Sequence, residues 1–109
     1  MRTYSNQFPW GCLVKNEIET ILKINDGLID DSWGNDVSPK IIFGDDFTVW
    51  VDHPDPNMRE LDNKQFVVEK TVVNDRITLD YELERIFDTD SLGDLVCFLE
   101  MLVRDTIEG

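Results

Sequence analysis

A predicted β-hairpin at residues 66–83 places the strongest constraint on how this chain folds. Phe66 to Val73 is rich in β-branched residues, and Arg76 to Leu83 alternates apolar with polar side chains, a pattern typical of two strands with one buried face. Asn74 and Asp75 between them fit a two-residue type I′ turn. Alternation places four apolar residues on one side of the second strand: Ile77, Leu79, Tyr81 and Leu83. It places four polar residues on the other, outer side: Thr78, Asp80, Glu82 and Glu84.

Two shorter strands are predicted upstream of this hairpin. They cover Lys40 to Phe43 and Phe47 to Asp52, with a turn at Gly44-Asp45-Asp46 between them. In the second strand, Trp50 alternates against its apolar neighbours and therefore lies on the polar side. Loops are expected at Asp30 to Pro39 and at His53 to Asn63, the latter because its prolines cannot continue a strand.

A helix is predicted towards each end of the chain. The first covers about Glu17 to Asp26, with Asn16 as N-cap, Glu19 completing a capping box and Gly27 in the left-handed position after the helix. The second covers about Leu92 to Ile107. Its expected cap is Ser91 with Asp94, and Asp88 and Asp90 lie near its positive end.

These elements indicate an α+β fold. We expect an antiparallel sheet of about four strands with two helices packed on one face. The length of 109 residues suits a single domain spanning 1–109.

The charge of the chain limits its function. Asp and Glu number 23 against 10 Lys and Arg, which gives a net charge of −13, yet 41% of the residues are hydrophobic. A disordered acidic tail would be poorer in apolar residues. We therefore expect a folded, soluble, cytoplasmic monomer that avoids nucleic acid and anionic membranes, with no signal peptide or membrane span. Cys12 and Cys97 are expected to be reduced and largely buried, because two cysteines are too few for a disulfide framework.

Catalytic and metal sites are not predicted. His53 is the single histidine, and one imidazole between carboxylates is weak evidence for a general base or a metal ligand. The stretch from Asp88 to Asp94 partly matches a calcium loop, but Leu92 and Leu99 stand where oxygen donors are required. Helix capping explains these aspartates better. We expect neither enzymatic activity nor a cofactor.

Carboxylates beside tryptophans form the candidate partner-binding site. Asp30, Asp31 and Asp36 surround Trp33 in one loop. Asp80, Glu82 and Glu84 are expected to share the outer face of the sheet with Trp50. Carboxylates on alternate strand residues lie about 6–7 Å apart. Large aromatic residues ringed by charge have the composition of a binding hot spot.

In general build the chain resembles bacterial immunity proteins of contact-dependent growth inhibition and related polymorphic toxin systems. The resemblance rests on its length, acidity, α+β pattern and the stretch from Phe87 to Leu92 leading into an apolar helix. It implies an inhibitor that binds a cationic toxin domain in a one-to-one complex, with a nuclease as the expected toxin. The alternative is a phage or plasmid nucleic-acid mimic that blocks a DNA-binding, CRISPR or restriction protein. A mimic should show a continuous acidic stripe, whereas an immunity protein needs an acidic patch with apolar anchors.

Overall fold

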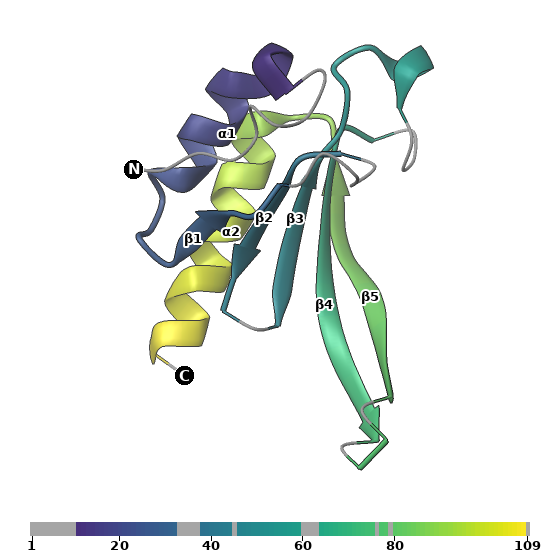
Figure 1. Cartoon of the computed structure of the whole chain (residues 1–109). Helices are drawn as coiled ribbons and strands as arrows, with labels where there is room; N and C mark the ends of the chain where they lie inside the picture. Colours follow the sequence, from purple (N-terminus) through teal and green to yellow (C-terminus); the bar gives the residue numbers. More distant parts are fainter. Residues whose placement is uncertain are drawn as a thin grey trace.

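The chain folds into one antiparallel five-stranded sheet whose strands lie side by side in sequence order (Figure 1). This computed structural model describes residues 11–32, 38–44, 46–59, 64–75, 77–78 and 80–108, apart from the side chains of residues 11, 12 and 108. The strands are β1 (Leu28–Asp30), β2 (Lys40–Phe43), β3 (Phe47–Val51), β4 (Phe66–Asp75) and β5 (Asp80–Thr89). The helices are α1 (Lys15–Leu22) and α2 (Leu92–Glu108), with short 3₁₀ turns at Gly11–Val14 and Pro56–Met58. The predicted α+β class is confirmed, with five strands where about four were expected.

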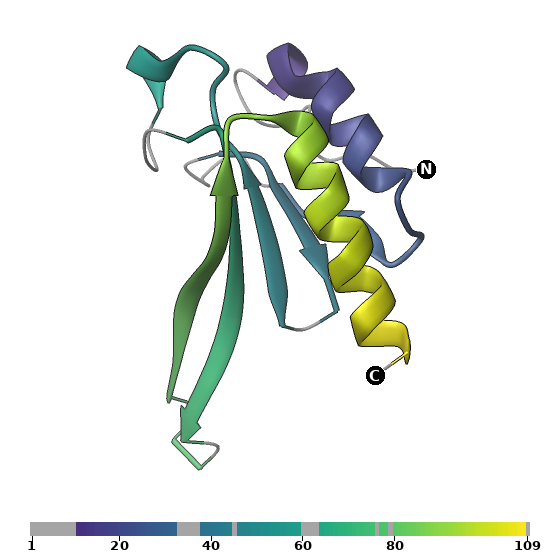
Figure 2. The same ribbon diagram turned by 180° about the vertical axis from the view of Figure 1, so that it is seen from behind.

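Both helices lie on the same face of the sheet, as Figure 2 shows. The core lies between them and the sheet, because every second strand residue points to that side. Ile41, Val49 and Val68, which occupy neighbouring positions on adjacent strands, are fully buried there. Ile18 of α1 and Leu99 of α2 belong to the same core cluster. No helix of the described residues lies on the opposite face of the sheet.

The α2 helix begins as predicted. The Asp94 backbone N–H donates to Ser91 Oγ at 3.2 Å, which is the expected N-cap bond. Leu95, Leu99 and Val103 of its apolar stripe are buried. Phe98 stacks on Phe87 of β5 with ring centroids 4.3 Å apart.

The α1 helix differs from the prediction at both ends. It begins at Lys15 and its N-cap is Val14, which makes no side-chain cap bond, so the predicted Asn16 capping box is wrong. A 3₁₀ turn from Gly11 to Val14 leads directly into the helix. The Lys23 backbone N–H then bonds the Glu19 carbonyl at the C-terminal end.

Gly27 serves packing rather than a left-handed helix end. Gly44, with φ of 62°, is the one described glycine with a positive φ. A Cβ added at Gly27 would lie 2.8 Å from Cε1 of Phe43. Leu28 pairs with Phe43 in the next position of the sheet. The missing side chain therefore lets the chain pass over the Phe43 ring as it enters β1, a strand that the sequence analysis did not predict.

The β4–β5 hairpin is longer than predicted, and its turn falls later. β4 continues through Asn74 to Asp75, and Asp75 pairs with Asp80. The predicted two-residue turn at Asn74 and Asp75 is therefore wrong. The Asp75 carboxylate instead accepts bonds from the backbone N–H groups of Ile77 (2.9 Å) and Thr78 (3.4 Å), which hold the chain as it turns.

Candidate partner-binding surface

The distal half of this hairpin projects from the sheet as a two-stranded arm (Figures 1 and 2). Lys70 pairs with Phe47, the first residue of β3, so β4 pairs with no strand other than β5 beyond that point, although the Thr71 N–H still donates to the Asp46 carbonyl. We define the hairpin arm as residues 71–75, 77, 78 and 80–84. A β-strand advances about 3.3 Å per residue, so five residues extend roughly 17 Å. Neither helix covers the arm in either view.

The arm exposes large apolar side chains. Exposed fractions are 52% for Val73, 94% for Ile77, 61% for Tyr81 and 50% for Leu83. Val73 and Tyr81 are direct cross-strand partners, and Thr71 pairs with Leu83. Partners in an antiparallel pair lie on the same face. One face of the arm therefore carries a strip made by Val73, Tyr81, Leu83 and Thr71, with Ile77 beyond it at the tip.

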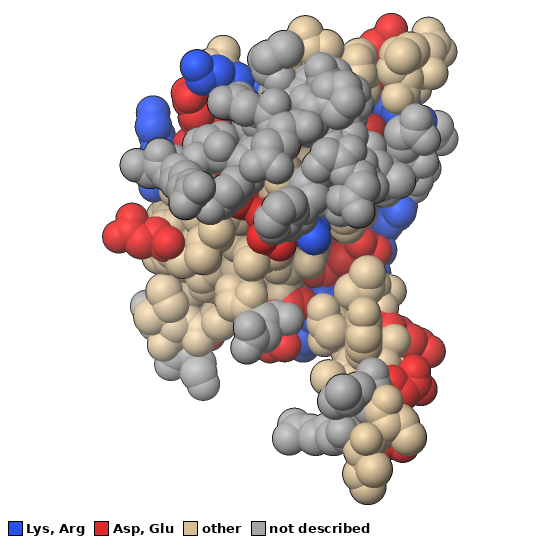
Figure 3. Space-filling view, viewed as in Figure 1, with Lys and Arg blue, Asp and Glu red and all other residues tan. Residues whose placement is uncertain are grey.

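The other face of the arm is acidic. Glu82 and Glu84 alternate with the apolar residues of β5 and are exposed. Asp75 and Asp80 add charge towards the tip, and hydrogen bonds from the N–H groups of Ile77 and Thr78 lower the pKa of Asp75. The described arm residues include neither lysine nor arginine. Figure 3 shows carboxylates along one side of the projecting hairpin, beside uncharged side chains.

The predicted orientation of the hairpin is wrong, because β5 contains an extra residue. Val68 pairs with Phe87 and Glu69 with Arg85, so Ile86 has no partner and forms a bulge. Phe87 packs against the core. Without the bulge, Leu83 would alternate onto the same side as Phe87. With it, Tyr81 and Leu83 face away from the helices, while Glu82 and Glu84 lie on the helix side, beyond the reach of the core. Leu79 lies outside the described residues.

Trp50 therefore does not share a face with the predicted acidic ladder. It pairs with Lys40 and Val67 on the open face of the sheet. Its Nε1–H donates to Glu69 Oε1 at 2.6 Å, and Lys40 Nζ lies 5.8 Å from its ring centroid. Val73 follows Val67 by six positions along β4, a span of roughly 20 Å. Trp50 is thus half-buried, bonded within the chain and distant from the arm.

The predicted acidic loop around Trp33 is only partly described. Asp30 ends β1 and is 1% exposed. Its Oδ1 accepts bonds from the backbone N–H and the hydroxyl of Ser32 at 3.1 and 2.7 Å. The buried Asp30 side chain therefore holds the turn at Ser32 and is not available to a partner, so its assignment to the binding cluster is wrong. Asp31 forms an ion pair with Lys40 at 3.6 Å. Trp33 and Asp36 lie outside the described residues.

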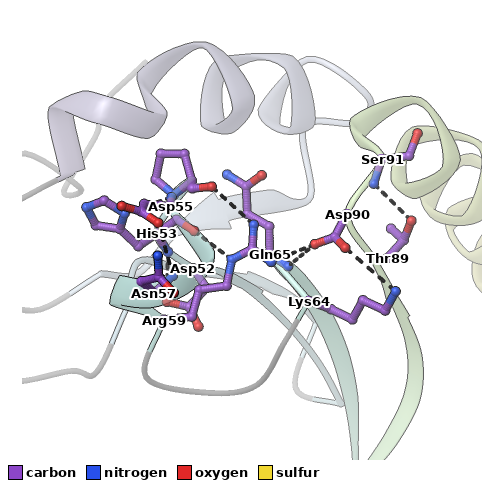
Figure 4. A network of polar contacts seen from close by, with 11 residues as sticks. Asp52, His53, Asp55, Asn57, Arg59, Lys64, Gln65, Thr89, Asp90 and Ser91 are labelled. Carbon is purple, nitrogen blue, oxygen red and sulfur yellow. Dashed lines mark hydrogen bonds and ion pairs between the residues drawn. The ribbon is translucent and has the colours of Figure 1, made fainter.

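A second cluster of polar side chains fastens the loop after β3 (Figure 4). The Arg59 side chain is 6% exposed, and it donates to the carbonyls of His53 and Pro54 and, at 2.8 Å, to Asp90 Oδ1. The Gln65 backbone N–H also donates to Asp90, and this bond and the Arg59 charge lower the pKa of Asp90. His53 Nδ1 accepts from the Asp55 backbone N–H. These bonds join the loop to Asp90 at the junction of β5 and α2.

The described part of the chain gives no support for metal ligation. No three His, Cys, Asp or Glu side chains there converge as a metal site would require. Asp88 lies 3.7 Å from Arg85, and Asp90 is held by Arg59. Cys97 is exposed, so the expectation that it is buried is wrong. The side chain of Cys12 lies outside the described residues.

Comparison with protein-family models, with curated proteins and with solved structures finds no match to this chain. Among the described residues, neither helix has the length and apolarity that crossing a bilayer requires.

Proposed function

We propose that this chain is an acidic inhibitor that binds and neutralises a basic protein in the cytoplasm, as immunity proteins do with toxin domains. The observation that carries the proposal is the hairpin arm. It presents Val73, Tyr81 and Leu83 on one face, with Glu82 and Glu84 on the other. Exposed apolar residues that project from a small domain mark an interaction site, because their burial is favourable only against a partner.

The chemistry of the arm fits a cationic partner. Tyrosine is enriched in binding hot spots, where aromatic anchors supply most of the affinity. Carboxylates beside the anchors would pair with lysine or arginine, and the net charge of −13 would steer a basic protein towards the arm. The partner class we infer is a cationic toxin domain. A nuclease is the leading candidate, because an enzyme that binds polyanionic nucleic acid carries a basic surface.

The apolar strip also separates this function from nucleic-acid mimicry. A mimic needs carboxylates in place of phosphates, and exposed Tyr81 and Leu83 would add nothing to that task. Inhibition by a mimic should depend on the carboxylates that take the place of phosphates and not on the apolar residues. Inhibition by an immunity-type inhibitor should depend on the apolar residues as well.

Coexpression with candidate basic domains, taken from the reading frames beside this gene, tests the proposal. We expect one of these domains to arrest growth, and this chain to restore growth and copurify with it at one to one. The arm variant Glu82→Lys with Glu84→Lys should lose protection, because the new cations would repel the partner. The matched control, Glu100→Lys with Asp105→Lys, changes the net charge equally on exposed positions of α2 and should still protect.

A further variant distinguishes the two functions. Tyr81→Ser should weaken neutralisation at least 30-fold, since an anchoring aromatic typically contributes about 2 kcal/mol or more. Equal potency of this variant and the parent would favour the mimic, because a mimic does not need the apolar side chain of Tyr81. Failure of the parent chain to protect would contradict the inhibitor proposal.

A further inference from the structure

The arm also presents an open strand edge. β5 is the last strand of the sheet, and both ribbon views show no other described segment beside its outer side. An unpaired edge offers backbone N–H and C=O groups to any extended chain that can lie against it. Such edges are the docking element in β-augmentation.

The direction of the backbone groups follows from one hydrogen bond. The Thr71 backbone N–H donates to the Asp46 carbonyl, on the side of β4 away from β5. Backbone groups of successive strand residues point to opposite sides, so those of Lys70 and Val72 point to β5. Their partners are Glu84 and Glu82. Tyr81 and Leu83 alternate with Glu82 and Glu84 along β5, so their backbone groups point to the open edge.

The two faces beside that edge differ in chemistry. Tyr81 and Leu83 present apolar side chains on one face, while Glu82 and Glu84 present carboxylates on the other. A strand added there would place alternate residues next to each set. Its matching sequence is an alternation of apolar and basic residues.

We propose that the edge of β5 from Asp80 to Glu84 accepts an extended segment of the basic partner as a sixth strand. Apolar residues of that segment lie against Tyr81 and Leu83, and lysines or arginines lie against Glu82 and Glu84. The inference rests on the proposed function, since it says how the basic partner binds.

Charge argues against a second copy of this chain as the occupant. Pairing two β5 edges would bring the carboxylates of Glu82 and Glu84 in one copy near those of the other. Like charges opposite each other destabilise a strand pair. Each copy also carries −13 overall. A basic segment removes that repulsion and supplies counter-charges.

The test uses a blocked nine-residue peptide that alternates lysine with valine as the probe. Its control is a peptide of the same composition with all lysines in one block, which cannot separate its charges onto one face. We expect the alternating peptide to bind at least tenfold more tightly. Binding should slow amide exchange at least tenfold at Tyr81 and Leu83. Equal binding of the two peptides, or unchanged exchange at both amides, would overturn the proposal.

Two variants of the protein provide an independent readout. Leu83→Ala shortens the side chain but keeps the N–H, and Leu83→Pro also removes the N–H that faces the open edge, where proline is tolerated. We expect Leu83→Pro to bind the alternating peptide at least tenfold more weakly than Leu83→Ala. Equal affinities of the two variants would count against strand addition. If circular dichroism shows that Leu83→Pro is unfolded, the proposal is judged by amide exchange at Tyr81 and Leu83 in the parent protein.

The outcomes also separate this inference from the proposed function and from self-association. A basic protein that is neutralised while the Tyr81 and Leu83 amides exchange as before would leave the inhibitor function standing and exclude the edge. Edge pairing with the peptide, but no neutralisation of a basic protein, would support the strand-addition site and contradict the inhibitor function. A dimer in sedimentation velocity that Leu83→Pro dissociates would assign the edge to a second copy and overturn the proposal.

Discussion

Replacing Trp50 by phenylalanine should destabilise the fold by about 1–2 kcal/mol. The substitution keeps an aromatic ring beside Lys40 but removes the Nε1–H that donates to Glu69 Oε1 at 2.6 Å. A hydrogen bond to an ionised group contributes about 1.5–3 kcal/mol. The expected cost lies at the lower end, because both side chains are only partly buried and the freed carboxylate regains water. Urea unfolding followed by far-ultraviolet circular dichroism at pH 7 measures this change in the free energy of unfolding.

A double-mutant cycle isolates the bond itself. Trp50→Phe and Glu69→Ala should show a coupling of about 1–2 kcal/mol, whereas Trp50→Phe with the distant Glu100→Ala should be additive to within about 0.5 kcal/mol. A coupling below about 0.3 kcal/mol for the first pair would refute the assigned role of the bond. Trp50→Phe should also leave binding to the arm unchanged, since the arm begins well beyond Trp50 along the sheet.

Three further predictions concern other parts of the fold. Gly27→Ala should destabilise by about 1–2 kcal/mol in chemical denaturation, because its Cβ would overlap the Phe43 ring; Gly44→Ala meets no atom but should cost about 1–2 kcal/mol for its left-handed backbone. The lowered pKa of Asp90 means that its stabilisation is present above the unfolded pKa of about 4 and is lost as pH falls through the folded value, so the melting-temperature difference between the parent and Asp90→Asn should shrink below about pH 4. Exposed Cys97 should react with a thiol reagent in the native state, with the label located at Cys97 by peptide mapping; labelling of this residue only after unfolding would contradict its exposure.

Local chemistry explains which elements were predictable from the sequence. The α2 helix has a capping serine and a long apolar stripe, so its start at Leu92 follows from neighbouring residues alone. β2 was predicted with its observed bounds and β3 to within one residue, because a glycine-containing turn separates two short apolar runs. These signals do not depend on distant parts of the chain.

The remaining features depend on tertiary contacts that no local pattern encodes. β1 has three residues and exists because it pairs with β2. The start of α1 lacks a side-chain cap, so the strong capping pattern at Asn16 was misleading. The bulge at Ile86 leaves the alternation of Asp80 to Leu83 intact, yet it reverses which set faces the helices. Of the candidate surface, the sequence analysis thus named the carboxylates Asp80, Glu82 and Glu84, but it neither named the exposed apolar strip nor predicted which way the two sets face.

The bulge at Ile86 gives the arm a means of changing specificity independently of the core. Phe87 is fixed by stacking on Phe98 of α2, whereas Asp80 to Glu84 extend into solvent. Deleting one residue at this position would exchange the apolar and acidic faces of the arm without altering a single arm residue. A lineage of such proteins could therefore change which face its arm presents in one mutational step, at the cost of the contact that Ile86 makes with the core.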